Sequence, residues 1–176
     1  MRAIVLCAVP IVPQLERLSL HVPDKKLKAH PNGVLSVILP LATQLRSLSL
    51  RGSVSSTDTA LIPRTIEHLE LRAFLPDNDY IALPRRLPNL KSWSSYMAAC
   101  STEFLAAFVH CKQLESLEVS YVAVMIADEA VDVVERLLAQ LPRLTRIHLA
   151  TLPCSEHDKY RWQQRYGVTV GTEERR

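Results

Sequence analysis

The chain has 176 residues, the length of one ordinary domain and enough to bury a sizeable core. Its formal net charge is +3 and its aromatic content is 6%, values too small to indicate a protein that binds nucleic acid or an anionic membrane. It contains no apolar run of about 18 residues, so we expect no transmembrane helix and no membrane partner.

The four cysteines are Cys7, Cys100, Cys111 and Cys154, and no two of them form a C-x-x-C pair. This spacing indicates neither a disulfide framework nor a zinc module, and it favours a reducing compartment, the cytoplasm or the nucleus.

The start of the chain allows two interpretations. Residues 1–13 carry a positive residue followed by an apolar run, which is the outline of a secretory signal peptide. They run directly into a repeated motif and show no small-residue cleavage site. We therefore favour residues 1–12 as an N-terminal cap or an incomplete first repeat.

A six-residue motif then recurs along the chain. It reads LERLSL at 15–20, LRSLSL at 45–50, IEHLEL at 66–71, LESLEV at 114–119 and LTRIHL at 144–149, with a degraded copy, LKSWSS, at 90–95. The first apolar residue of each copy, its anchor, lies 21 to 30 residues after the previous anchor. Self-similarity at this period is typical of a solenoid.

Apolar and polar residues alternate in the last four positions of each copy, as in a strand with one buried face. The motif therefore predicts six parallel strands that include residues 18–20, 48–50, 69–71, 93–95, 117–119 and 147–149. Stacked in register, their apolar residues would form one continuous core.

The segments between the motifs must return the chain to the same end of the sheet. Residues 34–45 have the apolar spacing of a helix, with a break at Pro40. Residues 101–111 and 128–141 predict two further helices, the first with Ser101 as N-cap. Residues 53–65 are rich in Ser and Thr and residues 75–88 contain three prolines, so we expect loops or short 3₁₀ turns there.

The C-terminal segment, residues 154–176, departs from the motif and interleaves Tyr160, Trp162 and Tyr166 with charges. One interpretation is a cap with a short helix over 158–165 followed by an extended 168–170, and the alternative is a docking tail. We favour the cap, because the end of a stacked sheet needs protection.

Over residues 13–152 the chain resembles the leucine-rich repeat family, on the strength of these L-x-x-L-x-L motifs. The resemblance implies an α/β leucine-rich-repeat solenoid of about six repeats over residues 1–153, with a curved parallel sheet and helices or loops on its convex side. The family usually places Asn or Cys eight residues after the anchor, whereas this chain has Pro23, Ser53, Phe74, Ala98, Val122 and Leu152 there. The irregular repeats are similar to the eukaryotic type found behind F-boxes.

Alternation also predicts which side chains point away from the core. At the sixth position after the anchor, His21, Arg51 and Arg72 occupy successive strands, and Tyr96 follows them. We take these four residues as the candidate partner-binding site. The cations suit a carboxylate or phosphate, so the expected partner is an acidic or phosphorylated protein segment. The alternative is a set of solvated charges, partly offset by Glu16, Glu67 and Glu70.

Catalytic and cofactor motifs are missing from the sequence: it contains no G-x-G-x-x-G, no P-loop, no G-x-S-x-G and no H-E-x-x-H. His148, Cys154 and His157 are close in sequence but make a weak metal pattern. Asp77 and Asp79 lack the remaining residues of a calcium loop and predict a turn. We therefore expect no catalytic residues, no cofactor and no metal.

The expected function is that of a non-enzymatic protein-protein interaction scaffold that uses the concave sheet face. The more specific expectation is substrate recognition in an F-box-type ubiquitin ligase. No room for an F-box lies ahead of Leu15, so that role needs a longer gene product or a separate partner. The alternative is a regulatory or structural leucine-rich repeat module unrelated to ubiquitin, acting in the nucleus, on a GTPase or in innate recognition.

Overall fold

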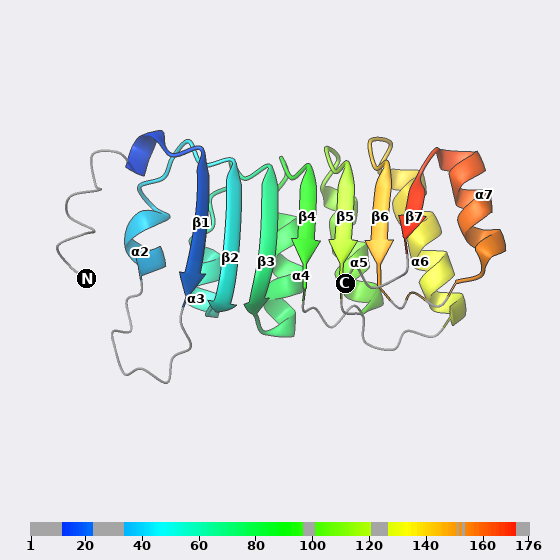
Figure 1. Cartoon of the computed structure of the whole chain (residues 1–176), viewed down its shortest axis with the longest axis horizontal. Coiled ribbons are helices and arrows are strands. Elements are labelled where there is room, and N and C mark those ends of the chain that lie inside the picture. Colours follow the sequence, from blue (N-terminus) through cyan, green and yellow to red (C-terminus); the bar gives the residue numbers. More distant parts are fainter. Residues whose placement is uncertain are drawn as a thin grey trace.

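The computed structural model describes residues 12–22, 34–96, 101–120, 127–150, 152 and 154–171. These residues form an α/β structure around one open, all-parallel sheet (Figure 1). Its seven strands lie in sequence order, each beside the one before it: β1 (Arg17–Val22), β2 (Ser47–Ser53), β3 (His68–Phe74), β4 (Ser92–Ser95), β5 (Ser116–Val119), β6 (Arg146–Leu149) and β7 (Thr169–Gly171).

The six strands expected from the motif are confirmed, and so is their register. Leu48, Leu69, Trp93, Leu117 and Ile147 are neighbours on five successive strands, and each is at most 2% exposed. Leu18 aligns with Leu48 but is only partly buried, because β1 is the edge of the described sheet. The apolar residues of the repeats therefore form a core that runs along the sheet.

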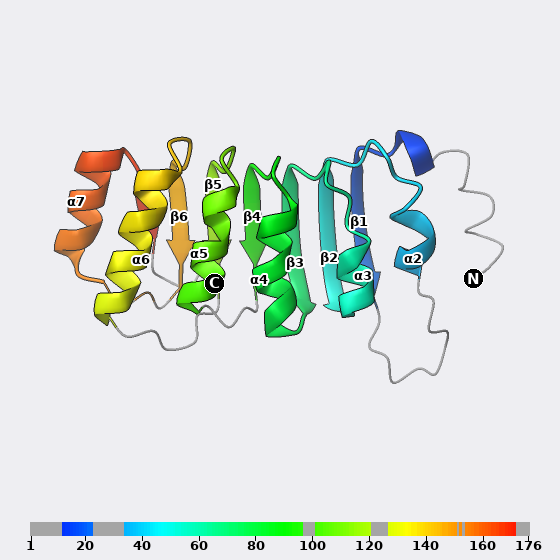
Figure 2. The ribbon, with the colours of Figure 1, turned by 180° about the vertical axis from the view of Figure 1, so that it is seen from behind.

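Helices cover one face of the sheet and leave the other open (Figure 2). Along the chain they are η1 (Val12–Gln14), α2 (Val34–Ile38), α3 (Ser56–Ala60), α4 (Asp77–Arg86), α5 (Thr102–Ala107), η2 (Phe108–His110), α6 (Ala127–Gln140) and α7 (Glu156–Tyr166). The helices expected over 101–111 and 128–141 are confirmed, and Ser101 caps α5 by accepting a hydrogen bond from the Phe104 N–H. The helix expected over 34–45 ends at Ile38, before Pro40.

Two expectations about the connections were wrong. Residues 53–65 contain the short helix α3 rather than only loops or 3₁₀ turns. Ser55 and Asp58 form a capping box at its start, and the Arg86 guanidinium of α4 donates to the carbonyls of Thr59 and Ala60 at its end. These bonds satisfy backbone groups that a single helical turn leaves without partners.

Residues 75–88, also expected to be loops or short turns, contain the ten-residue helix α4 with Pro84 inside it. Proline removes one helical hydrogen bond, and because Pro84 lies in the last turn, only the end of the helix is affected. Burial of Tyr80 and Leu83 against the core favours the helix over a loop. Asp77 and Asp79 form its first turn instead of a free turn, where their charges complement the helix dipole.

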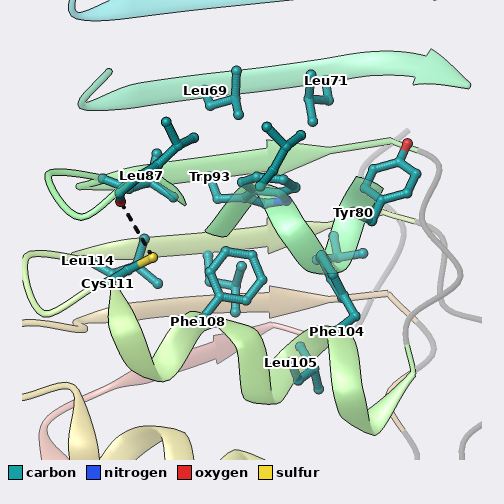
Figure 3. Packing of buried hydrophobic residues seen from close by; sticks show 14 of the residues in the cluster. Leu69, Leu71, Tyr80, Leu87, Trp93, Phe104, Leu105, Phe108, Cys111 and Leu114 are labelled. Atoms are coloured by element: carbon teal, nitrogen blue, oxygen red, sulfur yellow. Dashed lines mark hydrogen bonds between the residues drawn. The ribbon is translucent and has the colours of Figure 1, made fainter. Parts of the chain in front are cut away.

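An aromatic cluster fills the core beneath β4, where the motif is degraded. Trp93 lies against Phe104 and Phe108, with ring centroids 5.9 and 5.1 Å away (Figure 3). Its indole N–H donates to the hydroxyl of Ser95 at 3.0 Å, and both residues are buried. The large Trp93 and the small, polar Ser95 thus replace the two apolar residues found at these positions in the other strands.

The C-terminal segment continues the sheet. The helix and the extended stretch expected there are confirmed as α7 and β7, and β7 pairs parallel with β6. Trp162 is fully buried and donates to the Glu135 carboxylate of α6 at 3.3 Å. Gly167 ends α7 in the left-handed conformation, at φ 68°. The described part, 154–171, therefore packs against β6 and α6.

Several expectations concern residues outside the described part of the chain: most of the signal-peptide alternative for residues 1–13 and of the cap alternative for residues 1–12, the positions Pro23, Ala98 and Val122, and the cysteines Cys7 and Cys100. Among the helices that the structure describes, none combines the length and apolar character needed to cross a bilayer.

Candidate binding face

The side of the sheet turned away from the helices, here called the outward face, faces the viewer in Figure 1. Alternation along the strands places short or polar side chains on it: Arg17, Ser19, Ser47, Ser49, His68, Glu70, Ser92, Ser94, Ser116, Glu118, Arg146 and His148. Each of them is at least partly exposed, whereas the residues between them are mostly buried. This face is therefore a hydrophilic platform backed by the core.

The four candidate site residues lie side by side at one end of this platform. His21 is the register partner of Arg51, and Arg51 is the register partner of Arg72. Tyr96 continues the series, because its N–H bonds the Leu71 carbonyl immediately after β4. All four side chains are exposed, Tyr96 by 60%. We call His21, Arg51, Arg72 and Tyr96 the cationic row.

Glu70 lies two residues before Arg72 on β3, on the same face of the sheet, and modifies the charge of this row. Its carboxylate accepts a 2.7 Å hydrogen bond from the Ser49 hydroxyl and pairs with Arg72 at 2.6 Å. The Ser49 bond, followed by the charges of Arg72 and Arg51, lowers the pKa of Glu70 below its usual value although partial burial opposes the shift. Arg72 is therefore partly neutralised within the chain, whereas Arg51 has no ion pair among the described residues.

The other expected offsets are distributed differently. Glu67 does not contact the cationic row but accepts from Arg46 and, at 2.6 Å, from Lys91. Hydrogen bonds from Lys91 and Arg46 lower the pKa of Glu67. The residue directly after the anchor is charged in five successive copies of the motif, and the sign of its charge alternates from strand to strand. We call these residues the charge ladder: Glu16, Arg46, Glu67, Lys91 and Glu115. Sequence reading missed this charge ladder, although the alternating signs were visible at one repeat position.

A shallow hollow lies at the middle of the outward face, over β2, β3 and β4. It is lined by Ser47, Ser49, His68, Glu70, Ser92 and Ser94 and by the edges of two leucines. With a volume of ≈ 240 Å³ it is smaller than typical small-molecule sites, which occupy about 300 to 1,000 Å³. It is an open depression of the sheet surface.

The described cysteines are poor nucleophile candidates. Cys111 is buried and donates from its thiol to the Pro84 carbonyl at 3.2 Å (Figure 3 shows it beside Leu114, with its longer contact to Leu87). Burial raises the pKa of Cys111 to about 12 and also raises the pKa of Cys154. Because a thiolate is the reactive form, both thiols are held in their less reactive state.

The metal pattern considered for His148, Cys154 and His157 has no structural counterpart. Across the described residues, no three His, Cys, Asp or Glu side chains come together in a group that fits a metal ion. His148 instead faces β7, where a side chain on Gly171 would place its Cβ 2.5 Å from the His148 Nδ1 atom. A glycine at that position leaves room for the imidazole on the outward face.

Comparison with known proteins adds no assignment to this geometry. No protein-family model matches the chain, and the search of curated proteins returns no match.

Proposed function

We propose that this protein is a non-enzymatic interaction scaffold of the leucine-rich-repeat type, which binds a protein partner through its outward face. The observation that carries the proposal is the register of the motifs: six copies pair strand to strand without a slip, and the chain moves one strand in the same direction at each step. Such one-directional stacking with helices on a single side is typical of repeat proteins and supports the proposal.

The composition of the outward face supports binding rather than burial. In β1 to β3 it carries Arg17, Arg51 and Arg72 against the single carboxylate of Glu70, which leaves a formal excess of two positive charges, 3 − 1. Complementary charge favours an acidic or phosphorylated segment of a partner and speeds its association.

The more specific role, substrate recognition in an F-box-type ubiquitin ligase, rests on the resemblance of the motifs alone. Co-purification of ubiquitin-ligase subunits with the partner would support that role. Partner capture without them, and without any change in partner ubiquitylation, would favour a regulatory or structural repeat module.

A pair of bulky substitutions tests the proposed face. Ser94→Arg places a long side chain at the middle of the outward face, and Gln140→Arg adds the same side chain at the exposed end of α6 on the helical side. Both variants should fold, because both positions are at least partly exposed. Proteins captured by the tagged wild-type chain are identified by mass spectrometry and then compared between the two variants.

We expect Ser94→Arg to lose a partner that the wild type and Gln140→Arg retain. Equal retention by both variants would contradict binding through the outward face. Circular dichroism and thermal melting of both variants test whether a lost partner is due to unfolding of the variant.

A further inference from the structure

The cationic row has a spacing that selects for the shape of its ligand. Neighbouring strands in a sheet lie about 4.8 Å apart, so Arg51 and Arg72 stand about 4.8 Å apart in the row and Tyr96 stands about the same distance beyond Arg72. The midpoint of the two arginines is thus about 7 Å from Tyr96. An extended peptide repeats its side chains on one side every two residues, over about 6.6 Å.

The chemistry of the row has two parts. Two guanidinium groups on adjacent strands suit one carboxylate or phosphoryl group. Tyr96 is the one exposed large hydrophobic side chain on the outward face of the described residues, the others being Val37 and Leu41 near the N-terminal end and Tyr160 on α7. An exposed tyrosine offers contact area to an apolar side chain at low entropic cost.

Resting on the proposed scaffold function, we propose that the cationic row binds an extended peptide segment that crosses the strands, with an anionic side chain on Arg51 and Arg72 and an apolar side chain two residues away on Tyr96. The spacing of the two features is the specificity element. Arg51, which has no ion pair among the described residues, receives the anion first, and the anion then shares Arg72.

Glu70 acts as an internal competitor at this site. It already pairs with Arg72 at 2.6 Å, and its negative charge lies beside the position that the peptide anion takes. An incoming anion must displace this contact and overcome the repulsion. Removing the charge of Glu70 should therefore tighten binding.

The test uses the full chain and short labelled peptides built of glycine and serine. One peptide carries phosphoserine and, two residues on, leucine. Its matched control has the same composition with the leucine moved to the adjacent position, which points to the opposite side of an extended chain. A second pair carries glutamate in place of phosphoserine. Binding is measured by fluorescence anisotropy.

We expect the spaced peptide to bind several-fold tighter than its control, and Tyr96→Ser to remove that difference. The double variant Arg51→Gln with Arg72→Gln should weaken binding at least about tenfold, since it removes both cations that hold the anion. Arg146→Gln removes one cation from the same face outside the row and should change binding little. Glu70→Gln should tighten it several-fold.

Tighter binding of the phosphoserine pair would identify a phosphoryl group as the favoured anion, and equal binding of the two pairs would show that a carboxylate suffices. Equal affinity for spaced and control peptides, no saturable binding of any peptide, or insensitivity to the arginine variant would overturn the proposal. If partner capture remains sensitive to Ser94→Arg under those results, the scaffold function stands and only the peptide rule fails. If capture is insensitive as well, both fail.

Discussion

At the scale of single residues, one buried hydrogen bond joins the two unusual residues of the degraded fourth motif. Trp93 donates to Ser95 inside the core, so the two departures from the repeat compensate each other in volume and in polarity. A Leu at position 95 would leave the indole N–H of Trp93 without its acceptor. A buried donor without a partner costs about 1 to 3 kcal/mol.

Ser95→Ala should therefore reduce the free energy of unfolding by about 1 to 3 kcal/mol, because it removes the acceptor and leaves the donor buried. Its neighbour Ser94 points outward and serves as the control, so Ser94→Ala should stay within about 0.5 kcal/mol of wild type. Urea denaturation measures both. Similar losses for the two variants would contradict the buried bond.

Gly52 meets a steric requirement at the end of β2. Its φ is +97°, and an added Cβ would lie 1.9 Å from the Val22 carbonyl oxygen on β1. Gly52→Ala should thus cost at least about 2 kcal/mol, from backbone strain and displacement of β1. Gly167→Ala is the matched control: its φ is also positive, at 68°, but the added Cβ meets nothing within 4 Å, so a cost of only about 1 kcal/mol is expected. Thermal melts that rank Gly167→Ala as the more damaging change would refute this account.

At the scale of elements, two ion pairs of the charge ladder join the segments that enter β2, β3 and β4, in addition to the backbone hydrogen bonds. Glu67 on the chain entering β3 accepts from Arg46 beside β2 and from Lys91 beside β4, and its backbone carbonyl accepts the N–H groups of Lys91 and Ser92. Opposite charges on neighbouring strands favour this register, because a one-residue slip would turn their side chains to opposite faces and separate them.

Acid should weaken this link. The pKa of Glu67 is lower in the folded chain than its ordinary value of 4.5, so its stabilising effect is present above pH 4.5 and is lost as the pH falls through the lower, folded value. Glu67→Gln should therefore make thermal stability less dependent on pH below about 4.5 than it is in the wild type.

Glu115→Gln provides the comparison, because Glu115 occupies the same ladder position but has no ion pair among the described residues. Its melting temperature should follow the wild-type pH dependence. Melting temperatures are measured by circular dichroism from pH 3 to 6, about one and a half units either side of the ordinary glutamate pKa. If the melting temperature of Glu67→Gln depends on pH as the wild type does, the charge ladder is not a stabilising contact.

At the scale of the whole molecule, the core is a line of stacked layers with two ends. Its C-terminal end is covered by α7 and β7, where Trp162 and Val168 are buried. At the other end of the described sheet, Leu18, Leu20 and Val22 of β1 are only partly buried. Equivalent substitutions should therefore differ in cost with their position along the stack.

Leu117→Ala, in the middle of the stack, should cost about 2 to 5 kcal/mol as a buried large-to-small change. Leu18→Ala, at the edge, should cost clearly less, because part of its side chain already contacts water. Glu118→Ala tests the register beside Leu117 and should cost little, since its side chain lies on the outward face. Equal losses for Leu117→Ala and Glu118→Ala in denaturant melts would mean that the strand register is wrong.

Sequence alone determined six of the seven strands, their order and the members of the outward face, whereas the pairing of β7 with β6 was not foreseen. Alternation places each strand residue on one of two faces, and the repeat then aligns equivalent residues on successive strands, so His21, Arg51, Arg72 and Tyr96 could be named as neighbours in advance. Both signals are local and periodic, and neither depends on contacts between distant parts of the chain.

Tertiary structure decided the features that depend on such contacts. Pro84 and the Ser/Thr-rich stretch before it indicated loops, but burial of Tyr80 and the bonds from Arg86 to α3 favour helices there. The ion pair between Arg72 and Glu70 and the hydrogen bond from Trp93 to Ser95 depend on side-chain rotamers, which the alternation of apolar and polar residues does not specify. The residues of the candidate site could thus be named from the sequence. The ion pair that partly neutralises Arg72 could not, because it depends on which charged side chains lie next to one another in the folded chain.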